Sequence, residues 1–305
     1  MKYRYYLADL FTDEPFEGIP LPVFPEATGL GEGRMQQIAR ELGGFGTTFV
    51  FPAGEGKPNP TLRLFTPQRE VPVAIHAMQA AAFVLASTGR ISLDARHTRA
   101  VFSHGNQTVE CWISHKDGRP TLIQQALVAH AAIDYYTPTN EELAAMLSLT
   151  VPDIGFEYYR PLIISCGAPY LIVPIKSYRA IRAARFNERA WSQSSAPASL
   201  AQEILLFSNN TDPNPADFHT RLLGPAIGHQ EDPPTTGALP AFASHLCDHP
   251  HVREGTLTFA IQHGGKGIRR SLVHVEMDNR RTRDTSLRIG GSGVLVGEGT
   301  LEIPD

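Results

Sequence analysis

The stretch that decides the fold is AIHAMQAAAFVLASTG, residues 74–89. It is long enough for a helix of about four turns, and it is apolar on nearly every side, whereas a surface helix keeps one polar face. The stretch therefore predicts a helix that is buried inside the protein. A second alanine-rich stretch, TTGALPAFASHLC at residues 235–247, predicts another helix of the same kind.

Strand-like segments surround both helices. The first half runs through YRYYLADLF, TTFVFP and TLRLFTP, with the helix GEGRMQQIARELG between the first two; the second half repeats the order and starts with a helix that Asn140 is predicted to cap. This pseudo-repeat of roughly 130 to 150 residues predicts an α+β fold, in which each half wraps a mixed sheet or barrel round one apolar helix. The predicted halves are residues 1–128 and 129–291. The last strand, about 292–305, is a candidate to return to the first half.

Composition excludes several classes of function. The 305 residues carry a net charge of −4, so there is no basic field that would attract nucleic acid or an anionic membrane. No apolar run approaches the roughly 20 residues that span a bilayer, and the N-terminus lacks the apolar core of a signal peptide. Three scattered cysteines fit neither a zinc site nor a disulfide framework. We expect a cytoplasmic protein that holds no metal.

Five segments carry a family resemblance. They are DLFTDEPFEGIPLPVFPEATGL, MQQIARELGGFGTTFVFP, RLFTPQREVPVAIHAMQAAAFVLASTG, GHQEDPPTTGALPAFASHL and GGSGVLVGEGTLEI. In this order, over essentially the whole chain, they resemble the phenazine-biosynthesis isomerase (PhzF-like) family. The resemblance implies the diaminopimelate-epimerase-like fold, with an active site in the cleft between two similar halves. It also implies a homodimer that uses no metal or organic cofactor and works by acid–base chemistry on a small-molecule substrate.

The family's motifs transfer unevenly to this chain. Its segment around F-T-P-x-x-E-L-P-F-A-G-H-P keeps Glu70 and His76, and its E-D-P-A-T-G-S-A segment keeps Glu231, Asp232 and Thr235. The family's Gly-Ser pair is Thr236-Gly237 here, and an early asparagine is Ile19. Above all, the glutamate that serves as general base in the family's isomerases corresponds to Gly46.

Glycine at this position removes the family's base. A general base must lie within hydrogen-bond reach of its proton, and losing one costs a factor of roughly 10² to 10⁴ in rate. Three explanations stay open: another group supplies the base, the reaction needs none, or the protein binds its ligand without turnover.

Two residues are the candidates for catalysis. His76 stands at the predicted start of the first buried helix, where the positive end of the helix dipole favours the neutral, basic imidazole; the alternative is a histidine satisfied by the backbone. Asp232 stands near the start of the second buried helix; the alternative is a capping residue, because aspartate accepts backbone N–H bonds well at that position.

A further set of residues is predicted to contact substrate. His229 could replace the lost base, although an exposed histidine is the plainer interpretation, and threonines at element starts need no functional reason. Arg221 matches a family arginine but fits an ordinary ion pair, and Glu70 fits a role in ordering the turn before the first buried helix. The predicted substrate-contacting residues are Phe45, Gly46, Thr47, Ile19, Thr235, Thr236, Gly237 and His229.

The replacement of the family's asparagine by Ile19 and of its glutamate by Gly46 favours a roomier, less polar site than the family's. The sequence therefore predicts a cofactor-free isomerase or cyclase of specialised, natural-product metabolism, acting on a small and relatively apolar organic substrate. Two alternatives remain. One is a non-catalytic small-molecule binder that kept the fold, and the other is an ordinary isomerase of the family with a relocated base, for which His229 and Glu70 are candidates.

Overall fold

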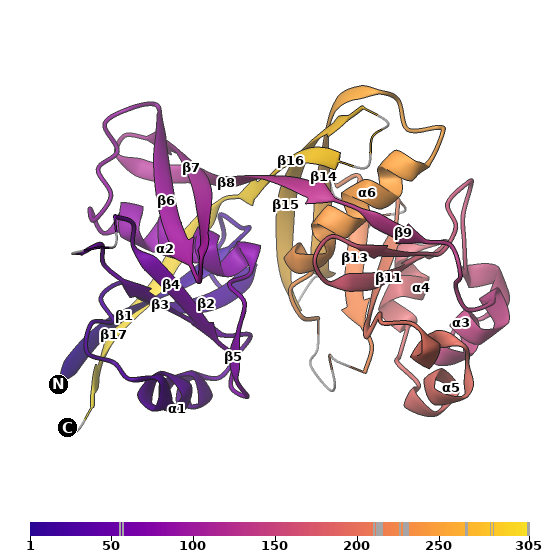
Figure 1. Ribbon diagram of the computed structural model, residues 1–305, viewed down its shortest axis with the longest axis horizontal. Helices are drawn as coiled ribbons and strands as arrows, with labels where there is room; N and C mark the ends of the chain where they lie inside the picture. Colours follow the sequence, from indigo (N-terminus) through magenta and orange to yellow (C-terminus); the bar gives the residue numbers. More distant parts are fainter. Residues whose placement is uncertain are drawn as a thin grey trace. The chain divides into compact units, whose positions relative to one another are not determined.

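The computed structural model describes residues 1–303 except 55, 57, 210, 212–215, 226, 228–231, 266–267, 281 and 283. Its contacts divide the chain into two compact units (Figure 1). Unit 1 consists of Met1–Ala126, Gly265–Leu272 and Ile289–Asp305, and unit 2 consists of Leu127–Gly264 and Val273–Arg288. The chain therefore passes between the units four times.

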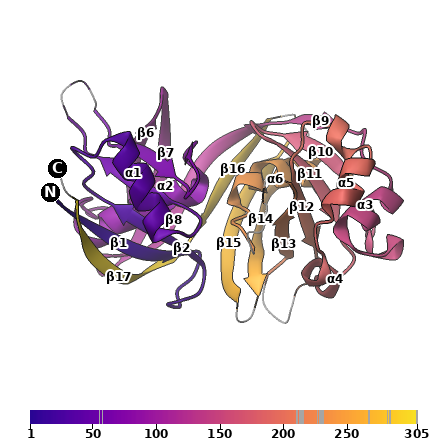
Figure 2. The same ribbon diagram turned by 90° about the horizontal axis from the view of Figure 1, so that it is seen from below.

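Unit 1 is a sheet around one buried helix. Its central strand β1 pairs antiparallel with β2 on one side and with the C-terminal strand β17 on the other, so the two ends of the chain lie side by side (Figure 2). The elements that lie wholly in unit 1 are β1 (Lys2–Leu10), β2 (Ile19–Phe24), α1 (Glu32–Leu42), β3 (Thr47–Phe51), β4 (Thr61–Phe65), β5 (Glu70–Val71), α2 (Ile75–Ser87), β6 (His97–His104), β7 (Gln107–Lys116) and β17 (Gly293–Glu302). Strand β8 (Arg119–His130) begins in unit 1 and ends in unit 2.

Helix α2 is the buried helix that its apolar sequence predicts. Every residue from Ile75 to Ala86 is buried, and the helix packs against β1, β2 and β3. Each large apolar side chain removed from water in this way stabilises the fold by about 1.5–3 kcal/mol. Gln79, a polar side chain within this apolar helix, donates from Nε2 to the carbonyl of Ile289 at 2.7 Å, whereas its buried Oε1 atom has no hydrogen-bond partner among the described residues.

Helix α1 covers the other side of the sheet with one apolar stripe. Met35, Ile38 and Ala39 are its buried residues, and they pack against the stacked rings of Phe24 and Phe49, whose centroids are 5.0 Å apart. The helix ends at Gly43, whose φ of 66° is costly for residues with a Cβ. The predicted amphipathic helix and its glycine stop are therefore confirmed.

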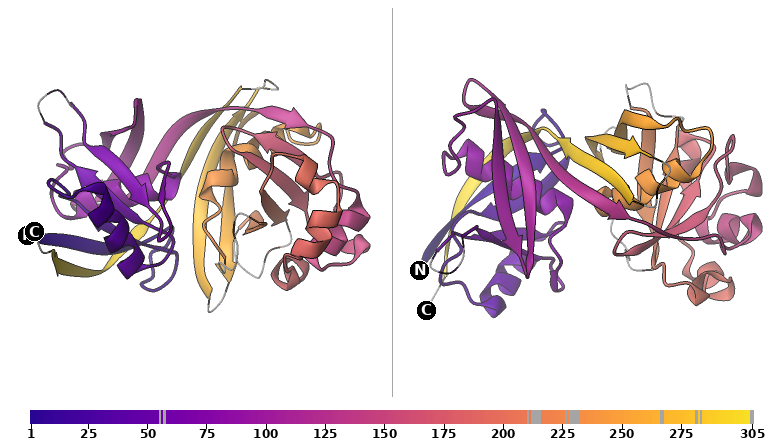
Figure 3. Two further views of the ribbon diagram at one scale, coloured as in Figure 1. Left: turned by 60° about the horizontal axis from the view of Figure 1, so that its bottom comes forward. Right: turned by 45° about the horizontal axis from the view of Figure 1, so that its top comes forward.

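Unit 2 also surrounds a helix, α6, with a sheet, and it adds a cluster of short helices. Helices α3 and α5 lie together at one edge of the unit (Figure 3). The elements of unit 2 are β9 (Ala132–Asp134), α3 (Asn140–Leu147), β10 (Leu162–Ser165), β11 (Pro169–Pro174), α4 (Tyr178–Ala183), α5 (Glu188–Gln193), β12 (Glu203–Ser208), β13 (Phe218–Leu223) and α6 (Leu239–Asp248). Strands β14 (Gly255–Gly265), β15 (Ile268–Asn279) and β16 (Asp284–Gly291) lie in unit 2 for part of their length.

Two predicted helix starts are corrected. Thr139, not Asn140, caps α3: its hydroxyl accepts from Glu142 N at 3.3 Å, while the Glu142 carboxylate accepts from Thr139 N at 2.9 Å. The second alanine-rich helix begins with a 3₁₀ turn, Thr236–Ala238, and becomes α-helical only at Leu239. Pro240 explains this late start, because proline is tolerated in the first helical turn but not further inside.

Candidate active site

The backbone at Gly46, in the turn before β3, disfavours a side chain. This residue has a φ of 155°, and a Cβ built on it would lie 2.9 Å from Leu64 Cδ1 and 3.3 Å from the carbonyl oxygen of Phe65. Residues with side chains rarely adopt such a φ, and the half-buried Phe45 precedes it. This backbone thus favours glycine at the position where the resemblance places the family's base.

Thr47 and Thr48 bury hydroxyl groups directly after this turn. Both side chains are 0% exposed, and neither Oγ1 atom has a hydrogen-bond partner among the described residues. An unsatisfied buried hydroxyl costs about 1–3 kcal/mol, so each of the two groups calls for a specific explanation. Because consecutive strand residues point to opposite faces, one bound molecule on a single face of β3 would satisfy only one of the two.

His76 lies in the first turn of α2. Its side chain is 8% exposed, and the preceding N-cap residue, Ala74, offers no side-chain hydrogen bond to the helix. The first-turn N–H groups of a helix carry the positive end of its dipole. Helix α2 also packs against β3, the strand that starts at Thr47. Unit 1 therefore contains both His76, in a helix that contacts β3, and the turn at Gly46 that leads into β3.

Ile19 lies away from Gly46 along the sheet. Strands β2 and β3 run parallel, with Val23 beside Thr48. Extending this register places Gly46 level with Leu21, two residues beyond Ile19, which corresponds to about 7 Å of strand. Ile19 is 2% exposed, and it belongs to the core of unit 1.

Asp232, in unit 2, is held between two arginines. Its side chain is 3% exposed; Arg182 Nη1 lies 2.7 Å from Oδ2 and Arg221 Nε lies 3.0 Å from Oδ1. Burial alone would raise the pKa of this carboxyl, but Arg182, His263 and Arg221 together keep the pKa below its ordinary value. A carboxylate held ionised by two guanidinium groups is a poor proton acceptor.

The capping role considered for Asp232 is wrong. The residue stands seven positions before α6, and neither the 3₁₀ turn nor α6 has a side-chain cap. Its backbone has a positive φ of 48°, a conformation that aspartate tolerates better than most residues. Arg221, the partner of Asp232, also donates from Nη1 to the carbonyls of Ile181 and Ala184 at the end of α4, at 3.0 and 2.9 Å. The ion pair foreseen for Arg221 is confirmed.

Two buried histidines, neither of them predicted from the sequence, complete this cluster. Burial lowers the pKa of His219 to about 3 and that of His263 to about 4, so both are neutral at pH 7. Both ring nitrogens of His219 lack a hydrogen-bond partner among the described residues, and its ring meets Tyr178 edge-on at 4.7 Å. The available signal was the polar run His219-Thr220-Arg221 inside an otherwise apolar strand.

The predicted threonines and Gly237 lie near the start of α6. Thr235 and Thr236 are buried, and Thr235 Oγ1 lies 3.1 Å from Thr220 Oγ1. A Cβ on Gly237 would lie 3.1 Å from the hydroxyl of Tyr170, and Tyr170 lies beside Glu203 in the parallel pairing of β11 with β12. Burial raises the pKa of the Glu203 carboxyl. Such a carboxyl is suited to proton transfer, and only the register of β11 and β12, which aligns Tyr170 with Glu203, reveals it.

The two residues considered for a relocated base have different outcomes. His229 lies outside the described residues. Glu70 is bound by Arg63, whose Nη2 lies 2.6 Å from Oε2, and the same nitrogen lies 3.0 Å from Glu32 Oε2 on α1. The hydrogen bond from Arg63 lowers the pKa of Glu70, so this carboxylate is already committed to an ion-pair network.

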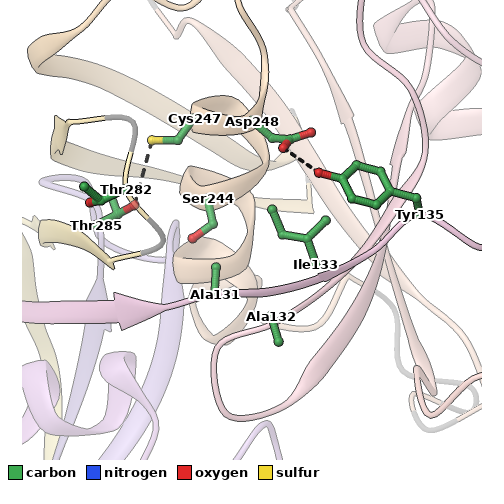
Figure 4. A pocket seen from close by; sticks show the side chains of 9 residues that line it. All are labelled: Ala131, Ala132, Ile133, Tyr135, Ser244, Cys247, Asp248, Thr282 and Thr285. Carbon is green, nitrogen blue, oxygen red and sulfur yellow. Dashed lines mark hydrogen bonds between the residues drawn. The ribbon is translucent and has the colours of Figure 1, made fainter.

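Within the described part of the chain, no group of three or more histidine, cysteine, aspartate or glutamate side chains could hold a metal ion. The same residues form no helix long and apolar enough to cross a membrane. A cavity of about 480 Å³ lies in unit 2 (Figure 4), and none of the predicted site residues lines it.

Comparisons with known proteins give one consistent result. The family model for phenazine biosynthesis-like proteins matches residues 8–299. An uncharacterized isomerase of Mesorhizobium japonicum is 30% identical over 302 residues, covering 98% of this chain and 99% of that protein. A trans-2,3-dihydro-3-hydroxyanthranilate isomerase of Pseudomonas chlororaphis is 27% identical over 304 residues, covering 98% and 99%.

A crystal structure gives the same result for the fold. A phenazine biosynthesis protein of the PhzF family from Bacillus anthracis superposes with a TM-score of 0.84 at 22% identity, covering 99% of this chain and 100% of that one. The chain is thus an α+β protein of the diaminopimelate-epimerase-like class, as the resemblance implied. It belongs to the phenazine biosynthesis-like family, whose curated relatives are named isomerases.

Proposed function

We propose that this protein is a cofactor-independent isomerase of specialised metabolism, in which His76 transfers a proton to or from a carbon atom of a small, relatively apolar substrate. The observation that carries the proposal is the environment of His76: a buried imidazole in the first turn of α2, in the same unit as a turn whose backbone disfavours a side chain at Gly46. Membership in a family of named isomerases supports the reaction class.

The proposal assigns Asp232 a positioning role rather than proton transfer. Its carboxylate is occupied by Arg182 and Arg221, so its protonation would have to break two ion pairs. We further propose Glu203, which lies beside Tyr170 in unit 2, as a second candidate for proton transfer. A carboxyl whose pKa is raised by burial is closer to the neutral range in which a general acid or base works best. This favours the relocated-base alternative over ring closure without proton transfer.

The rates of matched variants test this proposal. The probes are trans-2,3-dihydro-3-hydroxyanthranilate, after which a relative is named, and analogues with alkyl groups that make it less polar. We expect His76→Gln and Glu203→Gln each to lower kcat/KM by roughly 10²- to 10⁴-fold. His97→Gln, an exposed histidine that contacts Ser114, serves as the control and should change the rate less than twofold.

The outcomes separate the alternatives. If His76→Gln retains the full rate, the role of His76 is refuted. If Glu203→Gln retains the full rate while His76→Gln does not, Glu203 is not the relocated base. If the wild-type protein binds the probes without converting any of them, the non-catalytic binder is the better description. A rate that rises with the alkylated analogues would support the less polar substrate.

A further inference from the structure

A short connector, residues 72–74, leads from β5 to the first turn of α2. Strand β5 before it pairs with β4, and α2 after it carries His76 as its second residue. Pro72 has no N–H group that could be hydrogen-bonded, and Ala74, the N-cap residue of α2, makes no side-chain bond to the helix. The placement of His76 therefore depends on how the rest of the connector is held.

A hydrogen bond from Val73 ties this connector to β6. The backbone N–H of Val73 donates to Nε2 of His104 at 3.3 Å. Within the described part of unit 1, no other hydrogen bond joins residues 72–74 to a neighbouring strand. Because Ala74 alone separates Val73 from α2, this bond fixes the chain directly before the helix that carries His76.

His104 stands at an end of β6 that other strands support. It pairs with Gln107 across the turn that joins β6 to β7. The preceding residue, Ser103, donates from its backbone N–H to the carbonyl of Pro60 at 2.8 Å and pairs with Thr61 of β4. The half-buried His104 ring thus reaches the connector from a backbone that β4 and β7 hold in place.

The bond from Val73 specifies the chemical state of the His104 ring. A ring nitrogen accepts a hydrogen bond only when it carries no proton. While Nε2 accepts from Val73, the ring is therefore neutral and its one proton is on Nδ1. The contribution of His104 is an acceptor atom at one position, which an apolar side chain of similar size cannot supply.

We propose that His104 is a positioning residue for the proton transfer assigned to His76. By accepting from Val73, it fixes the connector and thereby the first turn of α2. This proposal rests on the proposed function, in which His76 exchanges a proton with a carbon atom of the substrate. Such a transfer needs the two partners within hydrogen-bond reach, and a displacement of about 1 Å can cost roughly 10²-fold in rate.

A matched pair of substitutions at His104 tests the proposal. His104→Gln keeps an acceptor oxygen at about the place of Nε2, whereas His104→Leu is similar in size but has no acceptor. With the isomerase probe that the wild type converts fastest, His104→Leu should lower kcat by about 10- to 100-fold and change KM less than about threefold. His104→Gln should retain at least about a third of kcat.

The control for these rates is His97→Leu, at the exposed start of the same strand, which should leave kcat unchanged. Thermal melting of each variant confirms that it is folded. Full kcat in a folded His104→Leu variant would overturn the proposal. Equal losses of kcat in His104→Leu and His104→Gln would also overturn it, because the acceptor would then not be what matters.

Two NMR readouts do not depend on turnover. In the wild-type protein at about pH 8.5, where an ordinary histidine is neutral, the nitrogen shifts of the His104 ring should show a proton on Nδ1 and none on Nε2. In His104→Leu, the amide of Val73 should exchange with solvent at least about fivefold faster than in the wild type, and in His104→Gln it should stay protected. A proton on Nε2, or unchanged exchange in His104→Leu, would contradict the proposal.

The rates of the variants separate this proposal from the proposed function. If His76→Gln loses activity and His104→Leu does not, the proposed function stands and the positioning role of His104 is refuted. If His76→Gln retains the full rate, the proposed function fails, and the positioning role fails with it even where the Val73 amide is protected. Losses in both His76→Gln and His104→Leu, with recovery in His104→Gln, support both.

Discussion

Among the described residues, each unit buries one acidic side chain: Asp9 in unit 1 and Asp232 in unit 2. Asp9 is 2.8 Å from Arg269, whose side chain is 38% exposed, and it also accepts from Phe16 N at 2.7 Å. Asp232 instead lies between Arg182 and Arg221, whose side chains are 19% and 7% exposed. The first carboxylate fixes a loop beside solvent, and the second holds two largely buried cations together. Similar burial thus supports two different roles.

The largest predicted effect is the loss of Asp232. Asp232→Ala leaves Arg182 and Arg221 without their counter-ion, so we expect the free energy of unfolding to fall by about 3–5 kcal/mol. Asp9→Ala should cost less, about 1–3 kcal/mol, because Arg269 can turn to water. Denaturant unfolding of both variants measures the difference. If Asp232→Ala lowers the free energy of unfolding no more than Asp9→Ala does, the two carboxylates do not differ in the way described.

The next largest effect concerns pH and His219. Burial lowers the pKa of His219 to about 3, while an unfolded histidine titrates near 6.5. The unfolded chain therefore binds the extra proton as the pH falls below about 6.5, and stability is lost on acidification down to about pH 3. Between pH 6 and 4, the titration of His219 should lower the free energy of unfolding by about 3 kcal/mol.

The matched variant isolates that effect. His219→Gln should show a shallower decline in the free energy of unfolding between pH 6 and 4, by about 1.4 kcal/mol per pH unit. His97→Gln, at an exposed position of unit 1, should leave the decline unchanged. Parallel pH dependences for the wild type and His219→Gln would show that His219 titrates normally in the folded protein.

A smaller effect is expected at Gly46. Gly46→Ala brings a Cβ within 2.9 Å of Leu64 Cδ1 and 3.3 Å of the Phe65 carbonyl, so we expect a loss of about 1–3 kcal/mol. Gly33, inside α1 with open space around its Cβ position, is the control, because Gly33→Ala should stabilise the protein by up to about 1 kcal/mol. Gly46→Glu should destabilise the protein and should not raise the isomerase rate. A faster, stable Gly46→Glu variant would show that the turn can hold the family's base after all.

The sequence predicts those features of the fold that depend on residues close together in the chain. The apolar run of α2 and the stripe and glycine stop of α1 are local signals, and the structure has both helices. The sequence alone does not identify the cap of α3, because Thr139 and Asn140 both have good capping side chains and only the bond to Glu142 distinguishes them.

The surroundings of the site depend on residues far apart in the chain. Arg182 reaches Asp232 from α4, fifty positions earlier, and no spacing in the sequence announces that pair. The pairing of Tyr170 with Glu203 likewise follows from strand register alone. The sequence could therefore indicate His76 and Asp232 as candidates, but it could not show that one of them is enclosed by arginines.

Proton transfer to carbon is the central claim, and solvent deuterium tests it most directly. The wild-type protein and His76→Gln are each incubated in D₂O with the probe, trans-2,3-dihydro-3-hydroxyanthranilate or an alkyl analogue, that the wild type converts fastest, and deuterium at each carbon of the recovered compound is measured by NMR. The account predicts deuterium at a carbon position with the wild type and roughly 10²- to 10⁴-fold slower incorporation with His76→Gln. Product formed without deuterium at any carbon, or equal incorporation by both proteins, would contradict it.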